Sequence, residues 1–272
     1  MNQKQSFQWS SAGRSHVGMV RAINEDACLA LPERGLWAVA DGMGGHEAGD
    51  VASQMVIETL QQIPPPSDWS HFLESVRESL HDVNQRLREE SAQRYQYRTI
   101  GSTVVVLIAY ETQCACLWVG DSRIYRLRDG QLQQLTRDHS HVQELVDQGL
   151  IAPESAHRHP LANVITRAVG SADELQIDEV EHPLQAGDLF LLCSDGLNKT
   201  VSDEEIARLL AHSDHNCQEA VKAFIHLALM RDANDNVTTV VVNIGEPALD
   251  DSDEEPGAET ITNPIPPDWY LQ

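Results

Sequence analysis

The chain has 272 residues, of which 41% are hydrophobic, so it can bury a full core as one large domain. Its formal net charge of −23 argues against nucleic acid or an anionic membrane as a main partner, because both require a basic surface. No stretch approaches the roughly 18 uninterrupted apolar residues of a membrane helix, and the first residues lack the apolar core of a signal peptide. We therefore expect a cytoplasmic, monomeric protein that binds neither nucleic acid nor membrane.

The first part of the chain predicts strands followed by a pair of helices. Residues 7–20 are typical of one or two opening strands, and residues 35–40 form a short apolar strand that ends at Asp41. A Gly-rich turn then opens a helix over 47–62, which stops at a run of prolines. A second amphipathic helix is predicted over 68–92, so the two helices can cover one face of a sheet.

Strands return after these helices. The pattern predicts an antiparallel meander with a hairpin turn at 128–131, and because no helices alternate with its strands, a Rossmann fold is excluded. The strands of the meander are expected at 102–109, 114–119, 123–127 and 132–135. Residues 137–170 are polar and rich in histidine, with a short helix near 141–148, which is typical of a mobile flap.

The last part of the chain predicts a second set of helices beside core strands. These elements are a strand at 188–193, helices at 203–212 and 216–231, and a strand at 237–244. The whole pattern fits an α+β fold, a four-layer α-β-β-α sandwich of two antiparallel sheets flanked by helix pairs. We expect one domain over residues 1–245, followed by an acidic, proline-containing disordered tail at 246–272.

Carboxylates occur at or beside the ends of four strand-like runs. They lie in the segments 24–26, 41–46, 194–196 and 235–236. Unpaired carboxylates are costly to bury, so acids that cap core strands need a metal, an arginine or protons to compensate their charge. A hard divalent metal with oxygen ligands fits best. Converging acids can serve two ions about 3.5–4 Å apart, a geometry suited to phosphoester hydrolysis by a water activated between them.

Arg21 precedes Glu25 by four residues and is expected close to the same acids. Its planar guanidinium can grip phosphate oxygens in a bidentate fashion. The alternative is a buried salt bridge to one of the acids, and spacing alone does not choose between the two.

Five segments resemble, in order, the motifs of bacterial protein phosphatase 2C-like enzymes, which are metal-dependent serine/threonine phosphatases. These segments are Gly18–Asp26, Ala40–His46, Val119–Arg123, Cys193–Leu197 and Asp235–Thr238. The resemblance spans about residues 10 to 244. It implies the same sandwich fold, with residues 1–245 as the catalytic domain, and Mn²⁺ or Mg²⁺ as cofactor in the form of two or at most three ions.

The resemblance also implies a role for each matching residue. Asp41 becomes the ligand that bridges two ions, and Arg21 becomes the clamp on the substrate phosphate. The remaining ligands, acting in part through waters, would be Glu25, the Gly42 carbonyl, Asp195 and Asp235.

Three further residues take supporting or additional roles by the same resemblance. Asp26 and Asn236 would support the ligands from behind. Asp121 matches a position that helps to hold a third ion together with Asp195, and its alternative role is a turn or capping aspartate before Ser122.

The acid that protonates the leaving oxygen is not identified by the motifs. Eukaryotic members have a histidine two residues after the bridging aspartate, where this chain has Met43. His46 lies nearby in sequence and is equally consistent with a surface histidine at a helix N-terminus. A metal-bound water can also supply the proton.

Two groups of polar residues in the flap are further candidates for function. His139, His141, His157 and His159 could together hold a metal, but we expect most of them to be exposed loop residues. A second group resembles the family's flap-closing segment and could contact substrate; it consists of Asn163, Thr166 and Arg167.

The five cysteines are an odd number and lie mostly in apolar stretches, which predicts reduced, structural thiols. Cys114 and Cys116 share one strand face, but without a second pair they do not indicate zinc. Cys28 and Arg34 have the spacing of cysteine-dependent phosphatases, yet the residues between them contain no glycine to form an anion cradle.

The resulting hypothesis is a phosphatase that acts on phosphoserine and phosphothreonine of a protein substrate and opposes a cognate bacterial serine/threonine kinase. The segment 32–37 and the stand-alone architecture look most like phosphatases associated with type VI secretion. The alternatives are a non-catalytic sensor or binding module with the same fold, and an enzyme for small phosphoesters or a dedicated regulator. Residues 265–270 contain the aromatic side chains of a possible docking segment.

Overall fold

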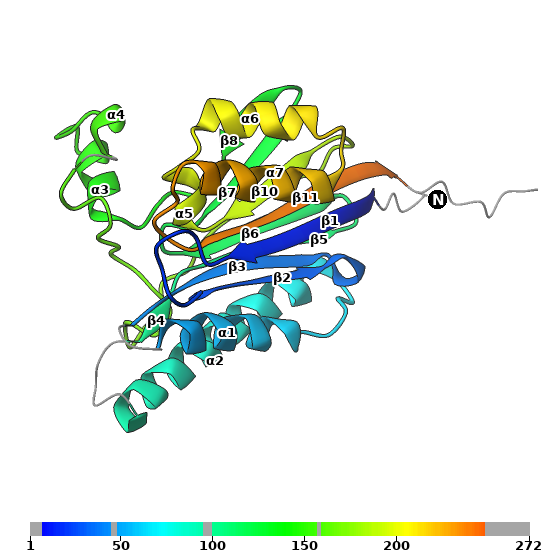
Figure 1. Ribbon diagram of the computed structural model, residues 1–272. Helices are drawn as coiled ribbons and strands as arrows, with labels where there is room; N and C mark the ends of the chain where they lie inside the picture. Colours follow the sequence, from blue (N-terminus) through cyan, green and yellow to red (C-terminus); the bar gives the residue numbers. More distant parts are fainter. Residues whose placement is uncertain (1–6, 45–47, 95–99, 157–158, 248–272) are drawn as a thin grey trace, which may run out of the picture.

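The computed structural model describes residues 7–44, 48–94, 100–156 and 159–247. Two antiparallel sheets form its centre (Figure 1). The first sheet has the strand order β1 (Phe7–His16), β11 (Val237–Pro247), β10 (Leu189–Cys193), β7 (Arg123–Arg128) and β8 (Gln131–Gln134). The second has the order β2 (Asp26–Leu31), β3 (Leu36–Met43), β5 (Val104–Tyr110), β6 (Gln113–Val119) and β9 (Asp178–Pro183), with the short β4 (Gly101–Ser102) beside β3.

Helices cover the outer face of each sheet. The long helices α1 (Gly49–Gln61) and α2 (Trp69–Arg94) lie against the second sheet (Figure 1). The first sheet is covered by α5 (Asp195–Asn198), α6 (Asp203–His212) and α7 (Cys217–Met230). This is the four-layer α-β-β-α sandwich that the periodicity predicts, so the predicted fold class is confirmed.

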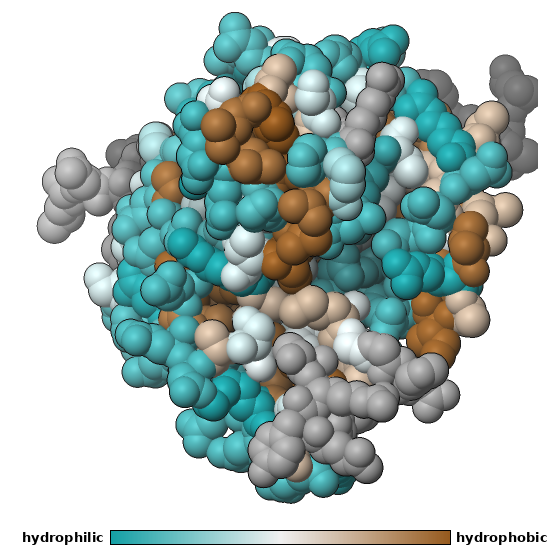
Figure 2. All heavy atoms as spheres, turned by 90° about the vertical axis from the view of Figure 1, so that its left-hand side faces the viewer, coloured by the Kyte–Doolittle hydropathy of each residue, from teal (hydrophilic) through white to brown (hydrophobic). Residues whose placement is uncertain are grey.

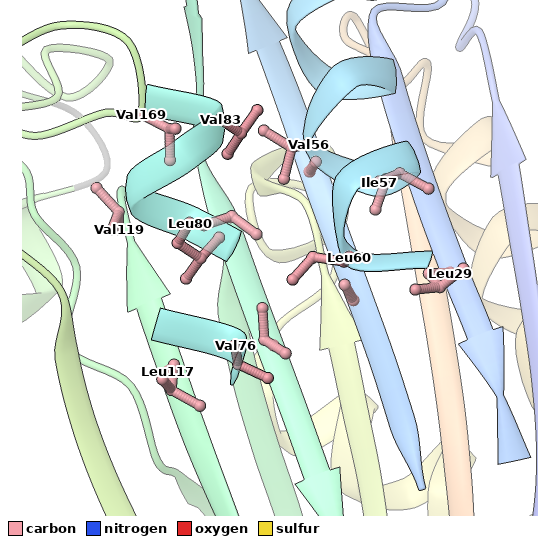
Figure 3. Packing of buried hydrophobic residues seen from close by; sticks show 14 of the residues in the cluster. Leu29, Val56, Ile57, Leu60, Val76, Leu80, Val83, Leu117, Val119 and Val169 are labelled. Atoms are coloured by element: carbon pink, nitrogen blue, oxygen red, sulfur yellow. The ribbon is translucent and has the colours of Figure 1, made fainter. Parts of the chain in front are cut away.

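Three apolar clusters hold the four layers together. One lies between the second sheet and its helices, where Val56 and Leu60 of α1 and Leu80 of α2 point towards Leu29 and Leu117 of the strands (Figure 3). A second packs α6 and α7 on the first sheet. The third lies between the sheets and includes Trp37, Cys114, Cys116, Phe190 and Val240. Burial of apolar area on this scale is the main stabilising term of the fold.

The ends of most elements agree with the sequence prediction. The two helices predicted at 47–62 and 68–92 are α1 and α2, and the helix predicted at 203–212 is α6, which starts with a capping box at Ser202. The opening strand ends at His16, earlier than predicted, because the chain turns at Gly18, which has a φ of 81°. Three strands, β2, β4 and β9, were not predicted.

Most of the described residues between 137 and 170 lie outside the four layers, at one end of the sandwich (Figure 1), although Val169 packs in the core. The described part of this segment contains two short helices, α3 (His141–Asp147) and α4 (Pro153–Ala156). The mobility of this flap remains a prediction, as do the domain bounds. The sequence-based interpretations of His46, His157 and residues 248–272 concern positions outside the described residues. No helix among the described residues is long and apolar enough to cross a membrane.

Candidate metal centre

The strand ends next to the flap enclose a cavity of about 440 Å³, called here the acidic cavity. Its lining includes five carboxylate residues, Glu25, Asp41, Asp121, Asp195 and Asp235. It is completed by other groups that include Arg21, Gly42, Thr103, Asn163, Lys199 and Asn236. The fold therefore brings together all residues that the family resemblance assigns to metal and phosphate, although they come from segments far apart in the sequence.

Asp41 owes its position to the pairing of β3 with its neighbours. It lies directly opposite Asp26 in the antiparallel pair of β2 and β3, so the two side chains project to the same face. Its backbone N–H donates to Thr103 Oγ1 at 3.2 Å, and its carbonyl accepts from Thr103 N at 2.8 Å. Thr103 thus fixes the strand at the point where the carboxylate opens onto the cavity.

Gly42 is required because α1 begins against the backbone of β3. A Cβ atom at this position would lie 1.9 Å from the carbonyl oxygen of Gly49 and 2.6 Å from that of Glu25. The Gly42 N–H donates to the Glu25 carbonyl at 3.0 Å. Glycine therefore allows three backbone segments to meet at the cavity wall.

Asp26 lies behind the cavity and connects the two sheets. Its Oδ2 accepts hydrogen bonds from the hydroxyls of Ser194 and Thr238, both at 2.7 Å, whereas its Oδ1 is buried without a partner. Ser194 Oγ also accepts from the Thr238 N–H at 3.0 Å. Burial raises the pKa of Asp26 to about 7, against these hydrogen bonds, and the charges of Asp195 and Asp235 add to the rise.

Asn236 holds the loop that carries Arg21 and Glu25. Its Oδ1 accepts from the Glu25 N–H at 2.8 Å, and its Nδ2 donates to the carbonyls of Val17 and Ile23 at 2.9 and 3.0 Å. Because all three contacts involve the backbone, this amide fixes the path of the loop over residues 17–25. Such a geometry suits the supporting role that the resemblance gives to Asn236.

Burial and neighbouring negative charges raise the pKa of two acids of the cavity, Asp41 and Asp121. Burial raises the pKa of Asp41 well above its ordinary value, and the charges of Asp26, Asp195, Asp121 and Asp235 act in the same direction. Burial and Asp195 raise the pKa of Asp121 to about 7, although the charge of Lys199 opposes this rise. Carboxylates that repel one another in this way favour binding of a cation.

Two basic side chains reach these acids. Arg21 Nη2 lies 2.9 Å from Asp235 Oδ2, with side-chain exposures of 48% and 29%, so it is an exposed ion pair and not the buried one considered as an alternative. Lys199 Nζ is in direct contact with Asp195 Oδ2. Because the Arg21 pair is solvated, little free energy holds the guanidinium in place, and it is free to turn towards a phosphate.

The carboxylate oxygens of the acidic cavity suit hard divalent ions, but they would need further ligands. Among the described residues, no three His, Cys, Asp or Glu side chains are placed to hold a metal ion by themselves. The five acids instead surround a shared cavity, where ions would complete their coordination with water and with the Gly42 carbonyl. The unpaired Asp26 Oδ1 and the mutual repulsion of the acids show that this region needs additional positive charge.

The flap contributes one of its three candidate residues to the cavity. Asn163 lines it, whereas Arg167 pairs with Asp178 at 2.8 Å and Thr166 is bonded through its backbone N–H to His139. His139 is an exception to the expectation that most histidines of the flap are exposed loop residues. This histidine is buried, stacks on Trp118 and accepts from the Gly120 N–H at 3.0 Å, so its role is structural.

The cysteine-dependent alternative is excluded by the surroundings of both residues. Burial raises the pKa of Cys28 to about 11, so its thiol is not a nucleophile at neutral pH. Arg34 donates to the carbonyls of Gln61 and Ile63 at 2.8 and 2.7 Å, which uses its guanidinium to hold the end of α1. All five cysteines are unpaired, as the sequence predicts.

Four residues of the site were not identified from the sequence: Thr103, Ser194, Thr238 and Lys199. Thr103 lies between β4 and β5 and Thr238 lies in β11, and threonine is common in strands whether or not it has a functional role. Ser194 directly precedes α5, where serine is common as an N-cap residue. The contact of Lys199 with Asp195 could have been predicted, because the two residues are four positions apart and one helical turn brings such positions together.

A second cavity of about 760 Å³, called here the flap groove, adjoins the acidic cavity. Arg21, Asp121, Asp195, Lys199 and Asp235 line both. Apolar side chains of the flap form part of the groove, and these are Val142, Val146, Pro153, Ala156 and Ala162. Figure 2 shows this end of the molecule, where brown apolar side chains occur among hydrophilic ones. The exposed large hydrophobic residues on the described segments are Met19, Val20, Ile23, Leu150, Leu161, Val164 and Met230.

Comparison with known proteins gives consistent results. The chain matches the family model for protein phosphatase 2C over residues 12–231. It is 39% identical over 233 residues to the serine/threonine protein phosphatase PstP of Mycobacterium tuberculosis, a match that covers 86% of this chain and 44% of that protein. The chain therefore spans less than half the length of this curated relative.

Solved structures are similar over nearly their whole length. PppA of Pseudomonas aeruginosa, described as a key regulatory component of the type VI secretion system, is 48% identical with a TM-score of 0.81, covering 88% of this chain and 99% of that one. The catalytic domain of PstP in complex with two manganese ions is 37% identical with a TM-score of 0.79, covering 89% and 100%.

Proposed function

The chain belongs to the protein phosphatase 2C family, and on that premise we propose that it hydrolyses phosphoserine and phosphothreonine in proteins with the help of divalent metal ions. The observation that carries this proposal is the acidic cavity. It gathers Glu25, Asp41, Asp195 and Asp235 at the strand ends and adds a solvated arginine at the edge. The described lining of the cavity contains no cysteine or serine, which suits a hydrolysis in which water attacks phosphorus directly.

The cofactor in this proposal is Mn²⁺ or Mg²⁺. When bound, two such ions supply a water of lowered pKa and neutralise charge on the phosphoryl oxygens. Asp41 would bridge them, with Glu25, Asp195, Asp235 and the Gly42 carbonyl as the other ligands. The support for this set is that all five residues line the acidic cavity, where Asp41 lies opposite Asp26 in the pairing of β2 and β3.

The chain's own side chains then orient the substrate. Arg21 would leave Asp235 and hold the phosphate oxygens, because the exposed pair costs little to open. Asn236 would keep Arg21 and Glu25 at a fixed spacing through its three backbone contacts. Asp26 and Asn236 are thus proposed to support the ligands and not to bind metal themselves.

The physiological partners are a phosphorylated protein and the serine/threonine kinase that modifies it. The five unpaired cysteines are in keeping with a reducing compartment, so we place the protein in the cytoplasm. We propose that it acts as a monomer.

An association with type VI secretion is proposed on the similarity to PppA. That protein is 48% identical to this chain, the highest identity among the structures compared above. The test is deletion of the gene in its host, followed by measurement of secretion-system activity and complementation with an Asp41→Asn variant. Complementation by the inactive variant would contradict a role through dephosphorylation.

A non-catalytic module is the less favoured alternative, because degenerate members lose metal ligands and all four acids line the cavity here. Small phosphoesters are the other alternative. Turnover of a phosphothreonine peptide and of an aryl phosphate with Mn²⁺ separates the cases. We expect higher kcat/KM for the peptide, because the flap groove offers it additional contacts. Equal values would indicate a small-molecule enzyme, and no turnover of either would indicate a binding module.

A further inference from the structure

Lys199 reaches back over the first residue of α5. This helix is a single turn that starts at Asp195, and the Lys199 N–H donates to the Asp195 carbonyl at 3.0 Å. The turn brings the Lys199 ammonium into contact with the Asp195 carboxylate. The single turn of α5 therefore fixes the Lys199 ammonium beside Asp195, an acid that is expected to bind metal.

The position of this ion pair differs from that of a surface pair on a helix. The side chain of Lys199 is 28% exposed and that of Asp195 is 14% exposed, and both line the acidic cavity. Lys222 and Glu219 on α7 form the comparable surface pair, with exposures of 52% and 63%. A partly buried pair in a cavity of like charges is stronger than an exposed one, because solvent screens it less.

Lys199 also acts on the acid across the cavity. Asp121 follows β6, is 6% exposed and lines the same cavity. Asp195 and Lys199 line this cavity and the flap groove together with Asp121. Arg21, the other described cation that lines the acidic cavity, is paired with Asp235. Lys199 is therefore the cation that contacts Asp195 and shares the cavity wall with Asp121.

We propose that the Lys199 ammonium supplies the positive charge between Asp121 and Asp195 that family resemblance assigns to a third divalent ion. The protein then binds two divalent ions at neutral pH and does not bind a third at these acids. The inference rests on the proposed metal-dependent function. It makes Lys199 a charge-compensating residue, whose tethered ammonium is present whatever the concentration of free metal.

The test is a Mn²⁺ titration of the full chain by isothermal calorimetry, with free Mn²⁺ counted independently by electron paramagnetic resonance. We expect two bound ions in the parent and an additional, weaker ion in Lys199→Met. The additional ion should disappear in the double variant with Asp121→Asn, because its binding needs both acids. Lys199→Arg keeps the charge and should bind two ions.

Lys222→Met is the matched control, because it removes an ammonium paired with Glu219 away from the cavity and should bind as the parent does. Three ions bound to the parent, or the same ion count in the parent and in a folded Lys199→Met, would overturn the inference. If Lys199→Met does not fold, the parent and Lys199→Arg counts decide it. A parent that binds no Mn²⁺ would instead contradict the proposed function.

Discussion

Asp26 and Asp41 are cross-strand neighbours with different surroundings. Asp41 opens onto the acidic cavity, whereas Asp26 is buried behind it between Ser194 and Thr238. The family resemblance makes Asp41 the candidate ligand and Asp26 its support. It could not predict the two hydroxyl partners of Asp26, since they come from strands whose approach depends on the whole sandwich.

Substitution of Asp26 tests its supporting role. Asp26→Asn keeps one oxygen as acceptor for the two hydroxyls and removes a buried charge, so we expect unchanged or higher stability of the metal-free protein. Loss of the negative charge should weaken Mn²⁺ binding by about 10–100-fold. Calorimetric Mn²⁺ titration and denaturant unfolding of the metal-free variant measure the two effects. Unchanged Mn²⁺ affinity would show that Asp26 does not support the site.

At the level of elements, the serines that precede α5 and α6 have different roles. Ser202 caps α6 in a capping box with Glu205. Ser194 occupies the N-cap of α5 but makes no capping hydrogen bond, because its hydroxyl is used for Asp26 and Thr238. The sequence pattern Ser202–Glu205 is typical of a capping box, whereas the role of Ser194 follows only from the tertiary structure.

Paired serine substitutions test this difference. Ser194→Ala leaves the buried Asp26 with one donor fewer and should cost about 1–3 kcal/mol of unfolding free energy, together with a loss of Mn²⁺ affinity. Ser202→Ala should cost about 1 kcal/mol through loss of the cap and leave Mn²⁺ binding unchanged. Urea unfolding and metal titration are the measurements. Equal Mn²⁺ affinity in both variants would contradict the assignment.

The contact of β3 with α1 gives a second prediction for an element. Gly42→Ala would place a Cβ 1.9 Å from the Gly49 carbonyl, so the start of α1 must move away from the cavity wall. We expect a loss of about 3 kcal/mol or more and weakened Mn²⁺ binding. Gly13→Ala in β1 is the control, since its nearest atom is a Val240 methyl at 3.3 Å. Similar effects of the two substitutions on metal binding would refute this account of Gly42.

Periodicity predicted the long elements and missed the short or irregular ones. The helices α1 and α2 have apolar residues at helical spacing over many turns, so their existence is fixed locally. β2 is six residues long and begins with an acid, and β9 is largely charged because it forms a sheet edge. These two strands exist because β3 and β6 offer them a partner, which local sequence does not reveal.

For the whole molecule, the acids of the cavity make stability depend on metal and pH together. The pKa values of Asp26 and Asp121 are raised to about 7 and that of Asp41 is also raised, so the metal-free fold holds protons that the unfolded chain has already lost. Since unfolded aspartates titrate near pH 3.9, stability of the metal-free protein should fall as pH rises from about 4 to about 7.

The Tm of chelated protein at about pH 5 and pH 7.5 tests this prediction. We expect the lower Tm at the higher pH, and we expect added Mn²⁺ to raise Tm most at the higher pH, because the ion binds the ionised acids. Asp41→Asn should reduce both the pH dependence and the response to Mn²⁺. A chelated parent protein that is more stable at pH 7.5 than at pH 5 would contradict the electrostatic account of the cavity.

The most direct test of the central claim is hydrolysis of a phosphothreonine peptide by the parent chain, Asp41→Asn and Cys28→Ser, each with Mn²⁺ and with a chelator. The account predicts that chelation abolishes parent activity and that Asp41→Asn lowers kcat/KM with Mn²⁺ by at least about 100-fold. Cys28→Ser should retain parent activity, because the pKa of its thiol is raised to about 11. Activity that persists under chelation or in Asp41→Asn, or that is lost in a folded Cys28→Ser, would contradict a metal-dependent phosphatase built on the acidic cavity.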